Sequence, residues 1–142
     1  MTDVVDAATR SRMMAGIQGK NTQPEMFLRK ALHAMGFRYR LGGQGLPGKP
    51  DMVFTKRRVV IFVNGCFWHR HECKSFKWPA SNPQFWRDKL DANAQRDSRV
   101  TVELQSKGWT VLTIWECELR QSKYKMPNPV VLAVAAKLRT LA

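Results

Sequence analysis

Three cysteines and a histidine have the residue types and spacing of a metal site. Cys66, His71 and Cys73 lie within eight residues in a C-x4-H-x-C arrangement, and Cys117 is the last cysteine of the chain. Three thiolates and one imidazole form a tetrahedral zinc site, which has no open coordination position and is therefore structural. His69 is an alternative histidine ligand, and three unrelated buried thiols are the alternative to a metal site.

A lone carboxylate is the second candidate for metal chemistry. Between Met26 and His71 the only acidic residue is Asp51, whereas the same stretch contains nine Lys or Arg residues. Such a carboxylate could be an ordinary ion-pair partner of a neighbouring cation. It could also bind a divalent cation that acts on phosphate. The residue types alone leave both interpretations open.

Large aromatic residues lie inside the same basic region. Phe67 and Trp68 follow Cys66 directly, and Trp86 lies on the first turn of the helix that we expect next. Consecutive aromatic residues in a loop commonly pack into the core. Within a basic loop they can also insert between stacked bases and bend a DNA duplex.

A helix must position the residues that precede this region. Thr22 and Glu25 have capping-box spacing, and Gly36 follows the last apolar residue of the helical pattern, so a helix is predicted between them. In this interpretation Glu25 only caps the helix. Residues 6–19 predict a short basic helix before it.

Apolar runs predict the strands. Residues 37–41 are expected to form a first strand, followed by a loop rich in Gly and Pro over residues 42–50. Residues 51–54 and 58–63 predict a tight hairpin, and the second of these strands is apolar on both faces, so it should be central. A last strand is expected over residues 109–116, ending at Cys117.

A long helix bracketed by Pro83 and Gly108 follows the cysteine-rich loop. Its apolar stripe is completed by two polar residues, Asn93 and Asp97, and polar groups on a core-facing stripe need partners. Asp97 is therefore either a satisfied structural residue or a carboxylate that supports a catalytic group. Asn128 and Pro129 predict the start of a final helix. The fold class is α/β: a mixed β-sheet flanked by helices.

The composition indicates a folded protein that binds a polyanion. The 142 residues include 24 Lys or Arg and 11 Asp or Glu, which gives a formal net charge of +13. Hydrophobic residues make up 44 %, with five Trp and seven Phe, which excludes a disordered basic tail. Nucleic acid is the usual partner of such a protein, and a generally adhesive basic protein is the alternative. We find no membrane span and no signal peptide, and we expect a cytoplasmic protein.

Several motifs in register resemble one known family. They are Leu46-Pro47-Gly48-Lys49-Pro50-Asp51, Asn64-Gly65-Cys66-Phe67-Trp68-His69-x-His71-x-Cys73, Phe85-Trp86, Arg96-Asp97 and Trp115-Glu116-Cys117. Together they resemble the very short patch repair (Vsr) endonucleases, which are bacterial DNA mismatch endonucleases with a restriction-endonuclease-like core. The resemblance extends from Ala8 to about Arg120, and the segment after Gln121 does not contribute to it.

The resemblance implies an enzyme that uses Mg²⁺ to nick one DNA strand 5′ to the T of a T:G mismatch. Asp51 matches the carboxylate that binds the metal, and the backbone carbonyl of Val63 matches a second ligand. His69 matches the general base, Asp97 the carboxylate that orients it, and Glu25 a residue that holds metal-bound water.

The same resemblance implies roles for residues outside the catalytic group. The structural zinc ligands are Cys66, His71, Cys73 and Cys117, the intercalating residues are Phe67, Trp68 and Trp86, and the further DNA contacts are Met14, Lys89 and Asn93. Two positions depart from the best-known member of the family. Val63 replaces a Thr, and Asn64 replaces a second active-site His; Asn64 cannot titrate but can donate a hydrogen bond to the scissile phosphate.

We therefore expect a single nuclease domain over residues 1–142. It would have a DNA-contacting arm over 1–21 and a helical tail over 121–142. We expect double-stranded DNA that contains a mismatch as the partner, and a monomer that acts at the bacterial nucleoid, with mismatch-repair proteins as further partners. The rival hypotheses are a restriction-type endonuclease and a zinc-stabilised DNA-binding module without catalysis.

Overall fold

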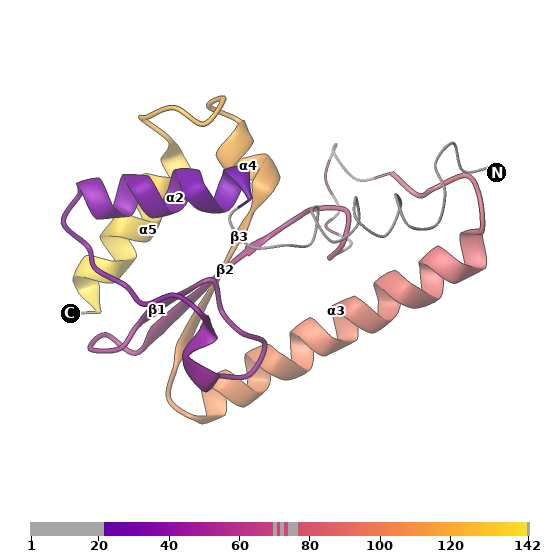
Figure 1. Ribbon diagram of the computed structural model, residues 1–142, viewed down its shortest axis with the longest axis horizontal. Coiled ribbons are helices and arrows are strands. Elements are labelled where there is room, and N and C mark those ends of the chain that lie inside the picture. The colour runs from indigo at the N-terminus through magenta and orange to yellow at the C-terminus, as the bar shows by residue number, and fades with distance from the viewer. Residues whose placement is uncertain (1–21, 70, 72, 74–76, 142) are drawn as a thin grey trace.

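The chain folds into a mixed β-sheet with helices on both faces (Figure 1). The computed structural model describes residues 22–69, 71, 73 and 77–141, so Met14 and the helix expected over residues 6–19 lie outside the described residues. In chain order the elements are α2 (Gln23–Ala34), a 3₁₀ turn (Gly43–Gly45), β1 (Met52–Phe54), β2 (Val59–Asn64), α3 (Pro83–Ser106), β3 (Thr110–Trp115), α4 (Glu116–Arg120) and α5 (Pro129–Thr140).

The sheet order within the described residues is β1-β2-β3, which confirms that β2 is the central strand. β1 and β2 form the predicted antiparallel hairpin, with Met52 opposite Ile61. β3 runs parallel to β2, with Val59 opposite Thr110. A parallel neighbour requires a long crossover, and α3 supplies it.

The prediction of a strand over residues 37–41 is wrong. Only Arg40 pairs with the sheet, through an isolated antiparallel bridge to Val53. Gly42 and Gly43, with φ of 81° and 73°, turn the chain into the 3₁₀ segment directly afterwards. Only glycine adopts such angles without strain, so the pairing ends after one residue.

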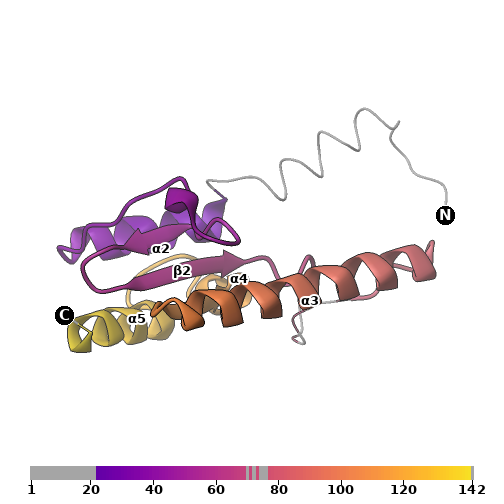
Figure 2. The ribbon, with the colours of Figure 1, turned by 90° about the horizontal axis from the view of Figure 1, so that it is seen from below.

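One face of the sheet carries the larger core, under α2, α4 and α5 (Figure 2). Alternate residues of the strands point to this side, and the helices supply Leu28, Leu32, Leu119, Val131 and Leu138, all fully buried. The segment after residue 121 is therefore part of the core. Asn128 caps α5 as predicted, because its side chain accepts hydrogen bonds from the N–H groups of Val130 and Val131.

The other face of the sheet packs against α3. Val53 and Val60 meet Leu104 and Trp109 in a second, smaller core, with Val100 packed beside it. Gly48, in the loop before β1, fits closely against this helix: a Cβ at this position would lie 2.5 Å from Val100 Cγ1. The loop that leads to Asp51 is thereby held against α3.

The last strand ends at Trp115, one residue earlier than predicted. Cys117 lies in the first turn of α4, a short helix that the sequence pattern does not predict. In the described part of the chain, no helix combines the length and hydropathy needed to cross a membrane.

Candidate active site and metal centre

The candidate catalytic residues meet in one open cleft of about 1020 Å³. The cleft lies where the first turn of α2, the start of β1, the end of β2, the following loop and α3 come together. Its lining contains every candidate that the resemblance suggested for catalysis: Glu25, Asp51, Val63, Asn64, His69 and Asp97. Elements that are distant in the sequence thus bring these residues together.

Asp51 lies directly before β1, and two hydrogen bonds to β2 hold it in place. Its N–H donates to the Ile61 carbonyl at 2.9 Å, and its Oδ2 accepts from the Val63 N–H at 2.7 Å. Burial raises the pKa of Asp51 to about 6; the Val63 N–H opposes this shift, the neighbouring Glu25 carboxylate adds to it, and His69 lowers the pKa. Ionising this carboxyl group costs free energy in the protein alone, and a bound cation would offset that cost by stabilising the charged form.

Glu25 does not act as the predicted helix cap. Within the described part of the chain, Thr22 makes no side-chain capping bond at the start of α2, so the capping box is not formed. Glu25 is instead buried, with 5 % of its surface exposed, and its Oε2 lies 3.2 Å from Arg29 Nη1. It also approaches the Asp51 carboxyl, so two acidic groups share one wall of the cleft.

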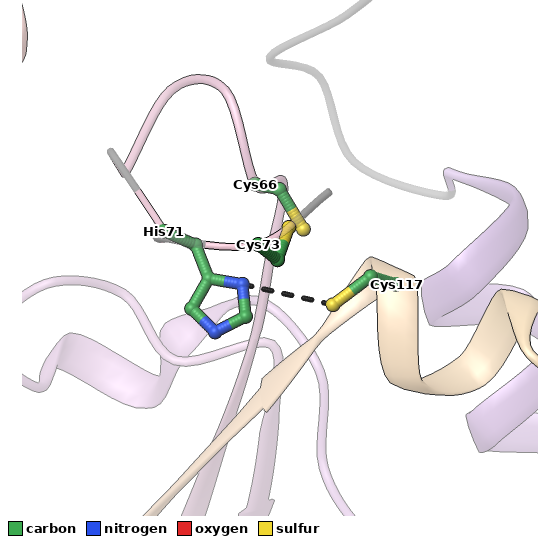
Figure 3. Close-up of side chains that lie close together, drawn as sticks. All are labelled: Cys66, His71, Cys73 and Cys117. Carbon is green, nitrogen blue, oxygen red and sulfur yellow. Dashed lines mark hydrogen bonds between the residues drawn. The ribbon is translucent and has the colours of Figure 1, made fainter. Parts of the chain in front are cut away.

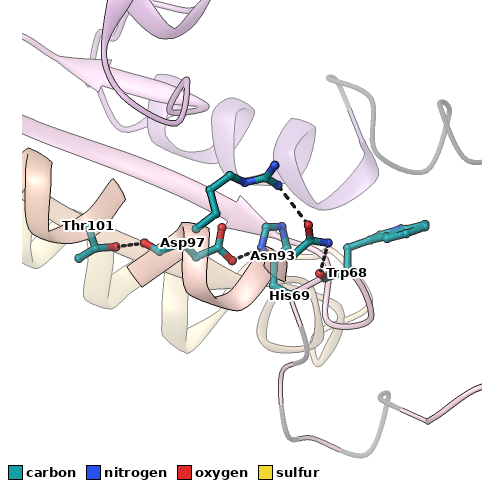
Figure 4. Close-up of polar contacts among 6 residues, drawn as sticks. Trp68, His69, Asn93, Asp97 and Thr101 are labelled. Carbon is teal, nitrogen blue, oxygen red and sulfur yellow. Dashed lines mark hydrogen bonds and ion pairs between the residues drawn. The ribbon is translucent and has the colours of Figure 1, made fainter. Parts of the chain in front are cut away.

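His69 and Asp97, which both line the cleft, form a direct pair (Figure 4). The Nδ1 atom of His69 contacts Asp97 Oδ2, as a hydrogen bond that becomes an ion pair when the ring is protonated. A carboxylate on Nδ1 fixes the ring orientation and leaves Nε2 as the nitrogen that can exchange a proton with water. Asp97 thus has a partner in His69, as a polar residue on a core-facing stripe requires.

Val63 and Asn64 end β2 at the floor of the cleft. Val63 presents its N–H to Asp51, a contact that sequence reasoning missed because it considered only the carbonyl of this residue. Asn64 is 9 % exposed and lines the cleft, opposite Trp115 in the sheet register. An amide at this place can donate a hydrogen bond.

The predicted metal ligands also come together, between the loop after β2 and the first turn of α4 (Figure 3). The ligand atoms of Cys66, His71, Cys73 and Cys117 all lie within 4.8 Å of one another, and His71 Nδ1 is 3.6 Å from Cys117 Sγ. The cluster contains His71 and not His69. The His71 ring stacks on Trp115, with 4.0 Å between ring centroids and 8° between the planes, which fixes the imidazole.

This donor set fits a tetrahedral metal. Bonds of about 2.3 Å to sulfur and about 2.0 Å to nitrogen put neighbouring ligand atoms roughly 3.8 Å apart, so small side-chain movements would close the observed group around an ion. Burial raises the pKa of the Cys66 thiol to about 12, and burial likewise raises that of Cys117. Uncharged thiols are stable there without a cation, and a bound metal would favour the thiolates instead.

Three aromatic residues of the cleft lining form a group that we call the aromatic cluster: Phe67, Trp68 and Trp86. Their ring centroids lie 5.1–5.9 Å apart, in edge-on or tilted contacts. Phe67 and Trp86 are half-buried. Trp68 is only 8 % exposed, whereas intercalation by all three rings would require each of them to be partly exposed in the free protein.

The two remaining DNA-contact candidates of the described part, Lys89 and Asn93, also line the cleft. Asn93 bonds to the protein itself: its Nδ2 donates to the Trp68 carbonyl at 3.1 Å. Lys49 and Arg96 line the cleft as well and were missed as site residues. The available signal was their position beside Asp51 and Asp97 in the sequence.

Comparisons with known proteins point in one direction. A family model described as "DNA mismatch endonuclease Vsr" matches residues 2–75. The chain is 46 % identical to the DNA mismatch endonuclease Vsr of Escherichia coli, over 84 % of this chain and 77 % of that protein. It is 44 % identical to the type II nicking enzyme V.XorIIP of Xanthomonas oryzae, over 84 % of this chain and 88 % of the relative. It is 41 % identical to the type II nicking enzyme V.NaeI of Lentzea aerocolonigenes, over 94 % of this chain and 77 % of the relative.

Proposed function

Because the chain belongs to the DNA mismatch endonuclease Vsr family, we propose that it nicks one strand of duplex DNA 5′ to the T of a T:G mismatch and so initiates very short patch repair. The observation that carries this proposal is the His69–Asp97 pair in the same cleft as the partly buried Asp51. Hydrolysis of a phosphodiester needs an activated water, and this cleft offers a base beside an anionic site for a cation.

His69 acts as the general base in this proposal. Its Nε2 takes a proton from the attacking water, while Asp97 holds the ring through Nδ1 and stabilises the imidazolium that results. Asn64, which lines the cleft, would donate its amide hydrogen to a non-bridging oxygen of the scissile phosphate.

Asp51 and the Val63 carbonyl would hold Mg²⁺, and Glu25 would hold water beside it. The residues fit this ion, because a hard divalent cation prefers carboxylate and carbonyl oxygens. Bound Mg²⁺ would neutralise the charge that develops on the phosphate and on the leaving oxygen. The raised pKa of Asp51 supports the assignment, since it marks a carboxyl whose charge lacks sufficient compensation in the protein alone.

The cysteine and histidine cluster would hold one structural zinc ion. Four protein ligands leave no position for substrate, so this ion would fix the loop that carries Phe67, Trp68 and His69. The chain would then act as a single restriction-endonuclease-like domain and as a monomer on mismatched DNA. We place it in the bacterial cytoplasm at the nucleoid, where its substrate is found, with mismatch-repair proteins as further partners.

A nicking assay tests this function. Duplexes with T:G and T:A at the same position, labelled separately on each strand, are incubated with protein in Mg²⁺ and without it. A Mg²⁺-dependent cut in the T strand of the T:G duplex alone supports mismatch nicking. Cutting of both strands of the paired duplex would indicate a restriction-type enzyme, and binding without cutting would indicate a DNA-binding module.

A further inference from the structure

One helix of the cleft holds two consecutive residues of the loop that follows β2. On α3, Asn93 and Asp97 are four residues apart and so lie on one face, one turn from each other. Asn93 contacts Trp68, and Asp97 contacts His69 (Figure 4). The first of these loop residues belongs to the aromatic cluster, and the second is the base of the proposed function.

The peptide unit between Trp68 and His69 is held at both of its polar ends. Its carbonyl accepts from Asn93 Nδ2 at 3.1 Å, and its N–H donates to the Gly65 carbonyl at 3.3 Å. A peptide unit is planar, so two fixed ends restrict the backbone angles on either side of it. These two bonds hold the backbone at His69, and the contact with Asp97 holds its ring.

The Trp68 side chain, in contrast to its backbone, is held by packing and not by a hydrogen bond within the described residues. Its indole Nε1 is buried and has no hydrogen-bond partner among the described residues. The ring is 8 % exposed and rests against Phe67 and Trp86. A buried donor without a partner costs free energy, and that cost favours conformations in which the ring leaves its place.

We propose that Asn93 is a positioning residue that keeps His69 in place while the Trp68 ring moves to engage DNA. Because the backbone is held at the carbonyl of residue 68, the ring can leave the aromatic cluster through its side-chain torsions alone. His69 and Asp97 then keep their geometry when the mismatch is bound. This inference rests on the proposed function, and it assigns Asn93 a task in the protein before any DNA contact.

The Asn93→Asp variant tests the inference most directly. Aspartate keeps the shape of the side chain and an acceptor for Arg96, whose Nη2 lies 3.4 Å from Asn93 Oδ1, but it has no hydrogen to donate to the Trp68 carbonyl. Gln95→Ala is the matched control, because Gln95 is an exposed amide residue on the same helix and does not line the cleft.

Hydrogen–deuterium exchange on the DNA-free protein is the first measurement. Asn93→Asp should speed exchange of the amides over residues 65–69 by about tenfold, and the rest of the chain and the Tm should match Gln95→Ala. This readout requires no nuclease activity, so it separates failure of the inference from failure of the proposed function. Unchanged exchange over 65–69, or faster exchange across the whole chain, would overturn the positioning role.

Single-turnover nicking of a saturating T:G duplex is the second measurement. Asn93→Asp should lower the rate by roughly ten- to a hundredfold, because small misplacements of a catalytic group have effects of this size. In a His69→Ala background the same change should have little further effect, since both act through one imidazole. A full additional loss in that background would overturn the inference and assign Asn93 to direct DNA contact.

Discussion

At the scale of single residues, the most informative side chain is Asp51, because its burial works against its own charge. The pKa of Asp51 is about 6 in the folded protein and 3.8 in a solvated carboxyl. The folded state therefore binds the proton more tightly than the unfolded state. The protonated carboxyl contributes fully to the free energy of unfolding below about pH 4, and this contribution is lost as the pH rises through about 6.

Asp51→Asn should abolish Mg²⁺-dependent nicking and yet stabilise the protein. Asparagine keeps an oxygen for the Val63 N–H but carries no charge, so above pH 6 the cost of burying the carboxylate is removed. The gain in the free energy of unfolding is up to about 3 kcal/mol in Mg²⁺-free buffer at pH 7.5, and it should shrink towards pH 4. Urea unfolding of both proteins across this range checks it; a variant less stable than the wild type at pH 7.5 would refute the cost that we assign to Asp51.

His69→Ala should separate catalysis from metal binding. The ring pairs with Asp97 and lies outside the ligand cluster, so the variant should keep the metal content of the wild type. Its single-turnover nicking rate should fall by about two decades or more, the usual effect of removing a general base. Metal analysis beside the rate measurement is decisive: loss of zinc on this change would make His69 a ligand.

At the scale of elements, the loop after β2 contacts two helices: its Cys66, His71 and Cys73 lie close to Cys117 of α4, and its Trp68 and His69 contact α3. Cys117, in the first turn of α4, connects that loop to the sheet and to the larger core. We expect about one zinc per chain, and Cys117→Ser should lower both the zinc content and the Tm, since a structural site contributes folding free energy directly. His33→Gln, which changes an exposed histidine of α2, is the control. A fully folded, metal-free preparation at neutral pH would contradict a structural role for the ion.

The start of α3 carries the aromatic residue best suited to test DNA stacking. Trp86 is half-buried in the aromatic cluster, and its neighbour Phe85 is 56 % exposed with its ring centroid 5.2 Å from that of Trp86. Trp86→Ala should weaken binding to a T:G duplex by roughly 1–3 kcal/mol, and binding to a paired duplex less, because charge dominates the latter. Phe85→Ala is the matched control. Equal losses for both duplexes would remove Trp86 from mismatch recognition.

The elements also show where sequence reasoning succeeds. The hairpin, the central strand, α3 and the capped α5 follow from apolar periodicity and from Asn, Pro and Gly at the element ends, which are local signals. The failures are not local. Residues 37–41 have a strand-like pattern but lose their pairing at Gly42, and α4 spans only five residues, too few for a periodic pattern.

At the scale of the whole molecule, the site is assembled by topology. The crossover from β2 through α3 to β3 brings Asp97 back to the loop that carries His69, 28 residues earlier. Residue types and spacing predicted a cluster of the three cysteines with a histidine, and the resemblance to the family predicted the members of the cleft. Neither residue types nor the resemblance could predict the buried position of Trp68 or the hydrogen bond from Asn93 to the Trp68 carbonyl. Both features depend on how α3 lies across the loop.

The most direct test of the account is the position of the cut, mapped at nucleotide resolution. The wild-type protein is incubated with a T:G duplex in Mg²⁺, and the product ends are compared with those from the matched T:A duplex and from Asp51→Asn. The account predicts one product, from the T strand of the T:G duplex, that ends directly 5′ to the mismatched T, and no product from either comparison. Cutting of the T:A duplex at the same rate, or cutting by Asp51→Asn at the wild-type rate, would contradict it.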